Sequence, residues 1–413
     1  MRRLLVVLMI FCLLVVACSS NTSREVGTAA PAATNPVAAA SPSPAPSAAS
    51  TPSAAPSAEQ TSTATSETPA ASAEPAQTSE GTAAGLPELA SGWTRIDAGG
   101  EAMCARGTPY SFWVRPGTVN KLLIYFQGGG GCWSAETCRQ GSTFFQDAAD
   151  ERDNPSYESG IFDLENPDNP FKDYYIVYVP YCTGDVHLGN NVYTYKDASG
   201  EEIVIHHKGF VNASTVMEWV YQQFKAPESI FVSGCSAGSV GSIMFAPYVI
   251  EHYRSVPVVQ MGDSEAFVFG RPVELQEDWR SHDNFPDWIP AVRAIEPGQW
   301  TAEKFYTAIA NFYPDRRFSQ YNTAHDSVQI RYFRAANGVG SWEEALDASM
   351  KEIHAKAPNF RSYLAGGSSH CITPFGSFYA VQSDGVYFRD WVDAMANGRD
   401  VENVRCTNCD SSE

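Results

Sequence analysis

The chain has 413 residues, of which 44% are hydrophobic, and its formal net charge is −19 at pH 7. This length is enough for a sizeable buried core, and a strongly acidic chain is repelled by phosphates, which argues against a nucleic-acid partner. The charge does not identify a substrate, because acidity is common in soluble secreted proteins.

Residues 1–17 have the pattern of a secretory signal. Arg2 and Arg3 precede an apolar run over residues 4–16, which is too short to span a bilayer as a mature helix. The run ends in V-V-A-C, which resembles a bacterial lipobox with valine where leucine is usual. We therefore expect cleavage before Cys18 and a lipid on Cys18 that anchors the protein to a bacterial cell membrane, outside the cytoplasm. An ordinary signal cut nearby, with Cys18 incidental, is the alternative.

Residues 18–90 consist almost wholly of Ala, Pro, Ser, Thr and Glu. Such a composition cannot bury enough apolar surface to offset chain entropy, so we expect a disordered tether without chemistry of its own. From residue 91 the composition becomes mixed and rich in aromatics. We therefore expect residues 91–413 to form one domain, because their number is within the length range of a single α/β enzyme. We expect the protein to be a monomer.

Eight cysteines lie in the expected domain. An even number in an exported chain indicates disulfides, although the sequence does not determine the pairing. The pairs that we expect are Cys132–Cys138, Cys104–Cys182, Cys235–Cys371 and Cys406–Cys409. Zinc is the rival interpretation of Cys406-x-x-Cys409, but no second pair or histidine is close in the sequence, so we expect no metal.

Strands and helices alternate along this domain. The sequence predicts strands at 121–126, 174–179, 229–233, 257–261 and 362–364, a further extended segment at 318–324, and helices at 209–224, 239–253, 342–357 and 387–396. This alternation predicts parallel β-α-β units, and thus an α/β-hydrolase-like fold with a mainly parallel sheet and helices on both faces. Ligands of such sheets bind beyond the carboxyl ends of the strands.

The sequence Gly234-Cys235-Ser236-Ala237-Gly238 directly follows one predicted strand and precedes a predicted helix. G-x-S-x-G in this setting is typical of a nucleophile elbow. The turn is so tight that larger side chains would clash at its two glycines, and it lifts the serine hydroxyl into the open. Ser236 is therefore the candidate nucleophile.

A serine hydroxyl needs a general base and an orienting carboxylate. In the α/β-hydrolase order the acid and then the histidine follow the serine. Of the later histidines, His370 has the best setting, in a glycine-rich loop after the predicted strand 362–364. Asp263 and Asp326 are the candidate acids. Asp326 is favoured, because Asp263 lies on the strand directly after the elbow and the acid loop usually comes one strand later.

Oxyanion donors are expected from the residue after the serine and from a loop early in the sheet. The Ala237 N–H fits the first role. The glycine run 128–131, directly after a predicted strand, fits the second, as in lipases and esterases. A glycine turn without a ligand is one alternative, and a phosphate cradle is another, although the run lacks the G-K-[ST] ending and a nearby basic residue.

Several motifs together resemble those of the pectin acetylesterase family, which includes animal carboxylesterases. G-G-G-G-C-W-x-x-x-T-C at residues 128–138 resembles its GGGWC…C segment, and P-Y-C-T-G-D at residues 180–185 resembles its YCDG element. G-C-S-A-G at residues 234–238 resembles its GCSAGG elbow. A-H-D-S-V-Q-I at residues 324–330 resembles its AYDSWQI motif, and H-C at residues 370–371 resembles its catalytic pair. They occur in the family's order over nearly all of residues 93–384, so the resemblance is specific.

The resemblance implies an α/β-hydrolase-like serine esterase without a cofactor. Its triad would be Ser236, Asp326 and His370, and its oxyanion hole would be formed by the amides of Gly129, Gly130 and Ala237. The resemblance also supports a disulfide that ties the elbow to the histidine loop through Cys235 and Cys371. Gly131 and His325 depart from the family's tryptophan and tyrosine. Both could line the acyl or alcohol pocket, so the substrate of the plant enzymes cannot simply be transferred.

We therefore expect an esterase that removes O-acyl groups, above all acetyl, from a carbohydrate through an acyl-enzyme. One alternative is a carboxylesterase that acts on lipid or protein-linked acyl esters. The other is a non-catalytic glycan-binding protein on the same scaffold, whose tryptophans would stack on sugars, although most tryptophans pack in cores. The expected partners are the ester substrate and, through the lipid anchor, a membrane.

Overall fold

The computed structural model describes residues 86–266 and 278–411. The expected signal, Cys18 and the tether up to residue 85 lie outside the described residues. Leu86 and Leu89 are half-buried and pack against the main core. The ordered fold thus includes residues that precede the expected boundary at residue 91, because two leucines at the end of a polar stretch find apolar partners.

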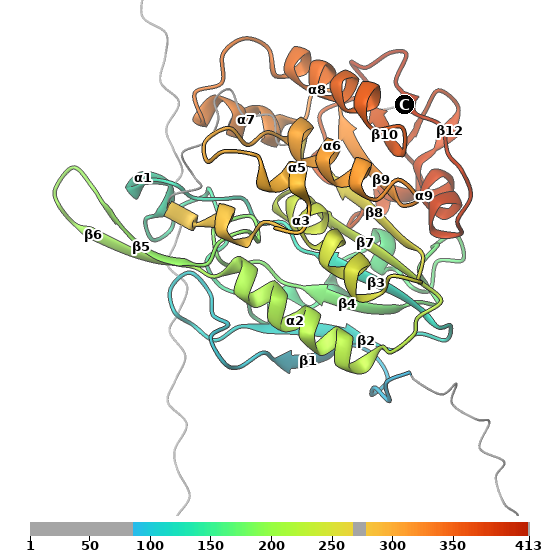
Figure 1. Cartoon of the computed structure of the whole chain (residues 1–413), viewed down its shortest axis with the longest axis horizontal. Coiled ribbons are helices and arrows are strands. Elements are labelled where there is room, and N and C mark those ends of the chain that lie inside the picture. The colour runs from blue at the N-terminus through green and yellow to red at the C-terminus, as the bar shows by residue number, and fades with distance from the viewer. Residues whose placement is uncertain (1–85, 267–277, 412–413) are drawn as a thin grey trace, which may run out of the picture. The chain divides into compact units, whose positions relative to one another are not determined.

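A nine-stranded sheet forms the centre of the described fold (Figure 1). Its strands, in spatial order, are β1 (Thr94–Asp97), β2 (Ser111–Arg115), β4 (Tyr175–Val179), β3 (Lys121–Phe126), β7 (Ser229–Cys235), β8 (Val258–Asp263), β9 (Arg317–Thr323), β10 (Phe360–Ala365) and β13 (Val404–Arg405). The pairings of β1 with β2 and of β2 with β4 are antiparallel, and all the others are parallel. The elbow strand β7 therefore lies near the middle of the sheet.

Two smaller antiparallel pairs lie outside this sheet. They are β5 (Asn191–Lys196) with β6 (Glu202–His207), and β11 (Gln382–Ser383) with β12 (Val386–Tyr387). The hairpin of β5 and β6 projects from the body of the domain (Figure 1). It leaves Val192 and Val204 exposed.

The helices surround the sheet. They are α1 (Ala135–Cys138), α2 (Gly209–Gln223), α3 (Ala237–His252), α5 (Pro290–Arg293), α6 (Ala302–Phe312), α7 (Ser327–Ala335), α8 (Trp342–Lys356) and α9 (Phe388–Ala396). None of the helices in the described ranges is both long enough and apolar enough to cross a membrane.

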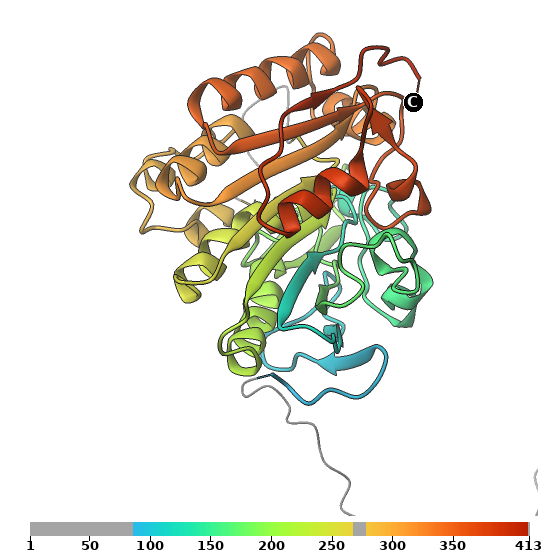
Figure 2. The ribbon, with the colours of Figure 1, turned by 90° about the vertical axis from the view of Figure 1, so that its right-hand side faces the viewer.

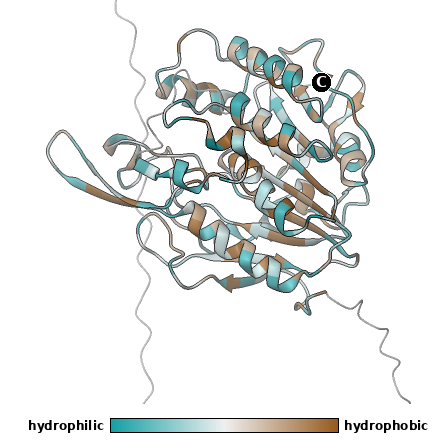
Figure 3. Ribbon diagram, in the orientation of Figure 1, coloured by the Kyte–Doolittle hydropathy of each residue, from teal (hydrophilic) through white to brown (hydrophobic). Residues whose placement is uncertain are grey.

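Side chains of successive residues in β3 enter two different cores. Leu122 and Ile124 belong to the core that includes residues of α2, α3, α6 and α8, whereas Leu123 and Tyr125 belong to the core that includes residues of α9. Figure 2 shows α9 in red in front of the strands, and Figure 3 shows hydrophobic residues along the central strands. Burial on both faces explains why this strand is almost continuously apolar. The mainly parallel α/β fold with helices on both faces is confirmed.

The eight cysteines of the domain form four disulfides, and these are the four expected pairs. Cys406 and Cys409 are bonded to each other, so they hold no zinc in this arrangement. The disulfide between Cys235 and Cys371 joins the end of β7 to the segment that carries His370. This cross-link connects two parts of the chain that are 136 residues apart.

Candidate active site

Ser236 is the single residue between β7 and α3. Its φ of 55° and ψ of −124° lie outside the regions that a serine normally occupies, which indicates backbone strain at the turn. The Ser236 N–H donates to the carbonyl of Asp263, at the end of the neighbouring strand β8, at 2.8 Å. Ser236 is 9% exposed. The strand, the turn and the helix thus form the elbow that the sequence predicts.

The two glycines of the elbow are required by close backbone contacts. A Cβ on Gly238 would lie 1.9 Å from the carbonyl oxygen of Phe126, at the end of β3. A Cβ on Gly234 would lie 2.3 Å from the carbonyl oxygen of Gly238. The first turn of α3 can therefore cross the end of β3 only where side chains are missing.

His370 and Asp326 form a buried hydrogen-bonded pair. The His370 Nδ1 lies 2.8 Å from Oδ2 and 3.0 Å from Oδ1 of Asp326. Asp326 is fully buried and caps the N-terminus of α7, where its Oδ1 accepts from the N–H groups of Val328 and Gln329 at 3.0 Å. Its Oδ2 also accepts from the Gln329 side-chain amide at 3.1 Å. These bonds fix the carboxylate, which in turn orients the imidazole.

The pKa of His370 is raised above its ordinary value of 6.5. Burial, the largest effect, lowers this pKa, but the hydrogen bond and negative charge of Asp326, together with the nearby carboxylates, outweigh it. The imidazole is therefore more basic than its burial alone would allow. A general base that abstracts a serine proton benefits from this shift.

Ser236 and His370 line the same two cavities, so the fold brings the expected nucleophile and base together. The structure contains no hydrogen bond between them: the buried Nε2 of His370 has no partner within residues 86–266 and 278–411. Catalytic hydrogen bonds are often long without substrate and tighten in the complex. The open Nε2 is the nitrogen that a base needs once Nδ1 is held by a carboxylate.

Asp263, the rival acid, bonds to the histidine loop rather than to the imidazole. Its Oδ2 accepts from the N–H groups of Ile372 and Thr373, at 2.9 and 2.8 Å, and from the Thr373 hydroxyl at 2.6 Å. Its neighbour Ser264 accepts from the Cys371 N–H at 2.9 Å. The pKa of Asp263 is raised above its ordinary value, because the effect of burial outweighs that of the hydrogen-bond donors, which lower it. Asp263 thus positions the loop, a role that its local sequence does not reveal.

The glycine run lies directly against the elbow. A Cβ on Gly128 would lie 2.6 Å from the Cys235 carbonyl oxygen and 3.0 Å from the Cβ of Ser236. The Gly131 N–H donates to the Phe144 carbonyl at 3.0 Å and is therefore occupied. The N–H groups of Gly129 and Gly130 have no acceptor in the described part of the chain. Only glycines permit this approach of the two backbones.

The Ala237 N–H supplies a third donor near the serine. Ala237 is the first residue of α3, and the first N–H groups of a helix lack intrahelical partners. The helix dipole also places a partial positive charge there. The amides expected to form an oxyanion hole thus belong to two backbone segments that meet at Ser236.

Two cavities meet at Ser236. The smaller has a volume of about 30 Å³ and the larger about 290 Å³. Both are lined by Gly130, Ser236, Val328, Tyr332 and His370. The smaller cavity is otherwise mainly apolar, whereas the larger one is more open and carries further polar side chains. Such a division suits an ester, whose acyl and alcohol parts lie on opposite sides of the reacting carbon.

The two departures from the family motifs have different outcomes. Gly131 lines the smaller cavity, where a Cβ would lie 3.8 Å from the Trp279 ring. His325 lines neither cavity, so the expectation that it lines the acyl or alcohol pocket is wrong. Its two ring nitrogens lie 3.3 Å from carboxylate oxygens of Glu343 and Asp410. The chain turns at this point to cap α7 with Asp326, which leaves its neighbour directed toward α8 and the C-terminal segment.

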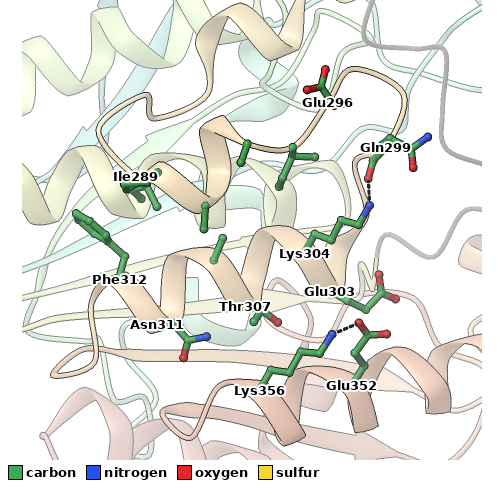
Figure 4. A pocket seen from close by; sticks show the side chains of 15 residues that line it. Ile289, Glu296, Gln299, Glu303, Lys304, Thr307, Asn311, Phe312, Glu352 and Lys356 are labelled. Atoms are coloured by element: carbon green, nitrogen blue, oxygen red, sulfur yellow. Dashed lines mark hydrogen bonds and ion pairs between the residues drawn. The ribbon is translucent and has the colours of Figure 1, made fainter.

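A separate hollow of about 670 Å³ lies between α5, α6 and α8 (Figure 4). Ser236 and His370 are absent from its lining. Its two lysines are already engaged, Lys304 with the Gln299 carbonyl at 2.8 Å and Lys356 with Glu352 at 2.6 Å. The hollow is a solvated surface groove, and its size does not make it the candidate site.

Two cysteine pairs lie beside a third residue of a metal-ligating type, namely Cys132 and Cys138 near His207, and Cys235 and Cys371 near Asp263. Both pairs are disulfides, and a disulfide sulfur is not the thiolate that binds metals. Neither cluster therefore offers a metal site in the oxidised protein.

An elbow at the carboxyl edge of a mainly parallel sheet, with a buried imidazole beside it, defines an α/β-hydrolase-like protein. A family model described as pectinacetylesterase matches residues 93–390, which is more than half of the chain. The chain belongs to the pectinacetylesterase family, and its class is therefore that of the esterases.

Two relatives show how far this likeness extends. The palmitoleoyl-protein carboxylesterase NOTUM of Schmidtea mediterranea is 26% identical over 153 residues, which are 34% of this chain and 27% of that protein. The chain thus matches about a quarter of the length of this curated relative. A solved structure of the Wnt deacylase Notum from Drosophila matches 76% of this chain and 96% of its own, with 15% identity and a TM-score of 0.56. This second match shows a shared fold.

We predict that kcat/KM for ester hydrolysis rises with pH through the pKa of His370, because only the neutral imidazole can accept the serine proton. The midpoint of this acidic limb is expected to lie above pH 6.5, because the pKa of His370 is raised above that value. In Asp326→Asn, burial acts without the carboxylate, so the limb should move to lower pH while kcat falls by roughly 1000-fold or more. The pH profile of 4-nitrophenyl acetate hydrolysis measures both effects.

Asparagine also caps helices, so this variant retains the start of α7. Asp150→Asn changes another capping aspartate, at the turn Glu151–Asp153, and should keep both the limb and the rate of the wild type. An acidic limb that stays in place in Asp326→Asn would contradict the assignment of Asp326.

Proposed function

We propose that the protein is a serine esterase that removes O-acetyl groups from a carbohydrate. Ser236 attacks the ester carbonyl while His370 Nε2 takes the hydroxyl proton, and Asp326 stabilises the resulting imidazolium. The proton then passes to the leaving alcohol, which leaves an acetyl group on Ser236. Water, deprotonated by the same imidazole, hydrolyses this acyl-enzyme and releases acetate.

The backbone amides beside Ser236 supply the remaining part of the mechanism. The tetrahedral intermediate carries a negative charge on the former carbonyl oxygen, and preorganised N–H groups stabilise this charge. We assign this role to the amides of Gly129 and Gly130, which have no acceptor among the described residues, and to the helix-terminal amide of Ala237. They cost no rearrangement at the moment of reaction, because the glycine run and α3 are already fixed against each other.

The smaller cavity is the observation that carries the choice of acetyl. Its volume of about 30 Å³ is about a tenth of the volume of the larger cavity, about 290 Å³. Trp133, Val186 and Trp279 close it. A methyl group suits this space, whereas a long acyl chain, such as the palmitoleoyl group in the name of the planarian relative, does not.

We also propose that the enzyme works outside the cytoplasm, held to a bacterial membrane by a lipid on Cys18. The four disulfides of the described domain support an oxidising compartment, since cytoplasmic thiols are kept reduced. Mass spectrometry of the mature N-terminus tests this part: a diacylated or triacylated Cys18 is expected, and an unmodified N-terminus at another residue would contradict it.

We predict that the wild type hydrolyses 4-nitrophenyl acetate and acetylated oligosaccharides, and that Ser236→Ala loses this activity by roughly 10⁴-fold or more, because the nucleophile is missing. Ser242→Ala, at a buried serine within α3, is the control and should keep its activity. Equal rates in the wild type and Ser236→Ala would refute the esterase.

We further predict a steep dependence on acyl length. From 4-nitrophenyl acetate to the butyrate, kcat/KM should fall by roughly tenfold or more, because the extra methylenes have no space. Trp133→Ala widens the smaller cavity and should raise the butyrate-to-acetate ratio by roughly tenfold. Trp93→Ala, at a half-buried tryptophan that lines neither cavity, should leave the ratio unchanged. A wild type that prefers the longer ester would contradict the acetyl assignment.

A further inference from the structure

Glu158 lines the larger cavity beside Ser236, and one of its oxygens is left unpaired by the described residues. Its Oε1 accepts from the Tyr178 hydroxyl at 2.8 Å. Its Oε2 is buried and has no hydrogen-bond partner among the residues that the structure describes. Buried polar atoms are nearly always paired, so this carboxylate oxygen needs a partner, which a water molecule or a polar group of a ligand can supply.

The neighbouring polar side chains of this wall already have hydrogen-bond partners in the protein. The Gln127 amide donates to Asp153 at 2.8 Å, and its oxygen accepts from the Tyr181 N–H at 2.9 Å. The Tyr125 hydroxyl is bonded to Thr373 at 2.8 Å. Glu158 Oε2 is therefore the acceptor that this wall leaves for a ligand, apart from the serine and histidine themselves.

The environment of Glu158 makes this oxygen costly to leave unpaired. Burial raises the pKa of Glu158 to about 7, the hydrogen bond from Tyr178 lowers it, and the nearby charge of Asp153 raises it. A sugar hydroxyl both donates and accepts, so it can pair with the ionised or the protonated carboxyl. The site thus matches a neutral polar ligand in either state.

Phe375 lines the same cavity and is 52% exposed, so its ring is accessible to a ligand. The segment that carries it is held to the segment of Glu158, because the Ser159 N–H donates to the Pro374 carbonyl at 3.1 Å. An acceptor and an exposed aromatic ring thus lie at the same cavity. A sugar ring offers hydroxyls at its edge and apolar C–H groups on its face, which match the two.

We propose that Glu158 and Phe375 form the alcohol-side subsite of this enzyme and select esters of neutral sugars over esters of uronic acids. The proposal rests on the proposed esterase function, in which the smaller cavity takes the acyl group and leaves the larger one for the alcohol. A hydroxyl of the sugar bonds to Glu158 Oε2, and the sugar face packs on the Phe375 ring. A uronate carboxylate in this cavity is repelled by the ionised form of Glu158, so the preference for neutral sugars should be strongest above the pKa of Glu158, about 7.

The test compares mono-O-acetylated xylobiose, as the neutral probe, with mono-O-acetylated digalacturonate and with 4-nitrophenyl acetate, which has no sugar. The variants are Glu158→Ala and Glu158→Gln, with Glu218→Ala on an exposed position of α2 as the matched control. Melting temperatures confirm that each variant is folded. The readout is the ratio of kcat/KM values for the sugar esters to that for 4-nitrophenyl acetate, with KM and kcat reported separately.

We expect the wild type to favour the xylobiose ester over the digalacturonate ester. In Glu158→Ala, the ratio for the xylobiose ester should fall by roughly ten- to a hundred-fold, mainly through KM, because a hydrogen bond to a charged group is lost. Glu158→Gln should restore part of this loss and raise the relative rate on the digalacturonate ester. Glu218→Ala should keep the wild-type ratios.

Equal losses on all three substrates would show that Glu158 has only a structural role and would overturn the subsite. Unchanged ratios in Glu158→Ala, or a wild type that favours the digalacturonate ester, would overturn it as well. In each case Ser236-dependent hydrolysis of 4-nitrophenyl acetate would leave the esterase itself intact. Loss of that activity from the wild type would instead refute the proposed function.

Discussion

The crossing of α3 over the end of β3 is the constraint on which the site depends. The Gly238 backbone lies so close to Phe126 that no side chain fits between them, and this contact holds Ser236 in its strained turn. The glycine run follows Phe126 by two residues, so the same contact brings the run's amides against the serine. One close approach between two backbones thus positions both the nucleophile and the groups that would stabilise the oxyanion.

Two buried aspartates divide the task of placing the base. Asp326 bonds to the imidazole, and its own position is fixed by the N-terminus of α7. Asp263 bonds to the backbone that follows His370, and its carbonyl bonds to Ser236. Asp263 therefore connects the elbow to the histidine loop by hydrogen bonds, and the Cys235–Cys371 disulfide connects the same two segments covalently. The strained turn can persist because so many bonds surround it.

Much of this arrangement can be predicted from the sequence, because the elbow and the central strands carry strong local patterns. The strand at 121–126 and the elbow follow from apolar runs and glycine spacing. The hairpin of β5 and β6 escaped prediction, although β-branched and aromatic residues flank its turn. Glu158 and the bonds of Asp263 could not be predicted, since their partners are distant in the chain. His325 was misplaced because a motif gives the position of a residue but not the direction of its side chain.

The central claim is that the fold makes Ser236 an activated nucleophile. Labelling of the folded protein with a fluorophosphonate, followed by peptide mass spectrometry, tests this claim most directly. Such reagents react with a serine hydroxyl only where a base and oxyanion donors activate it. The account predicts a single adduct on Ser236, formed much more slowly in the Asp326→Asn variant. No adduct, or an adduct on another serine, would contradict it.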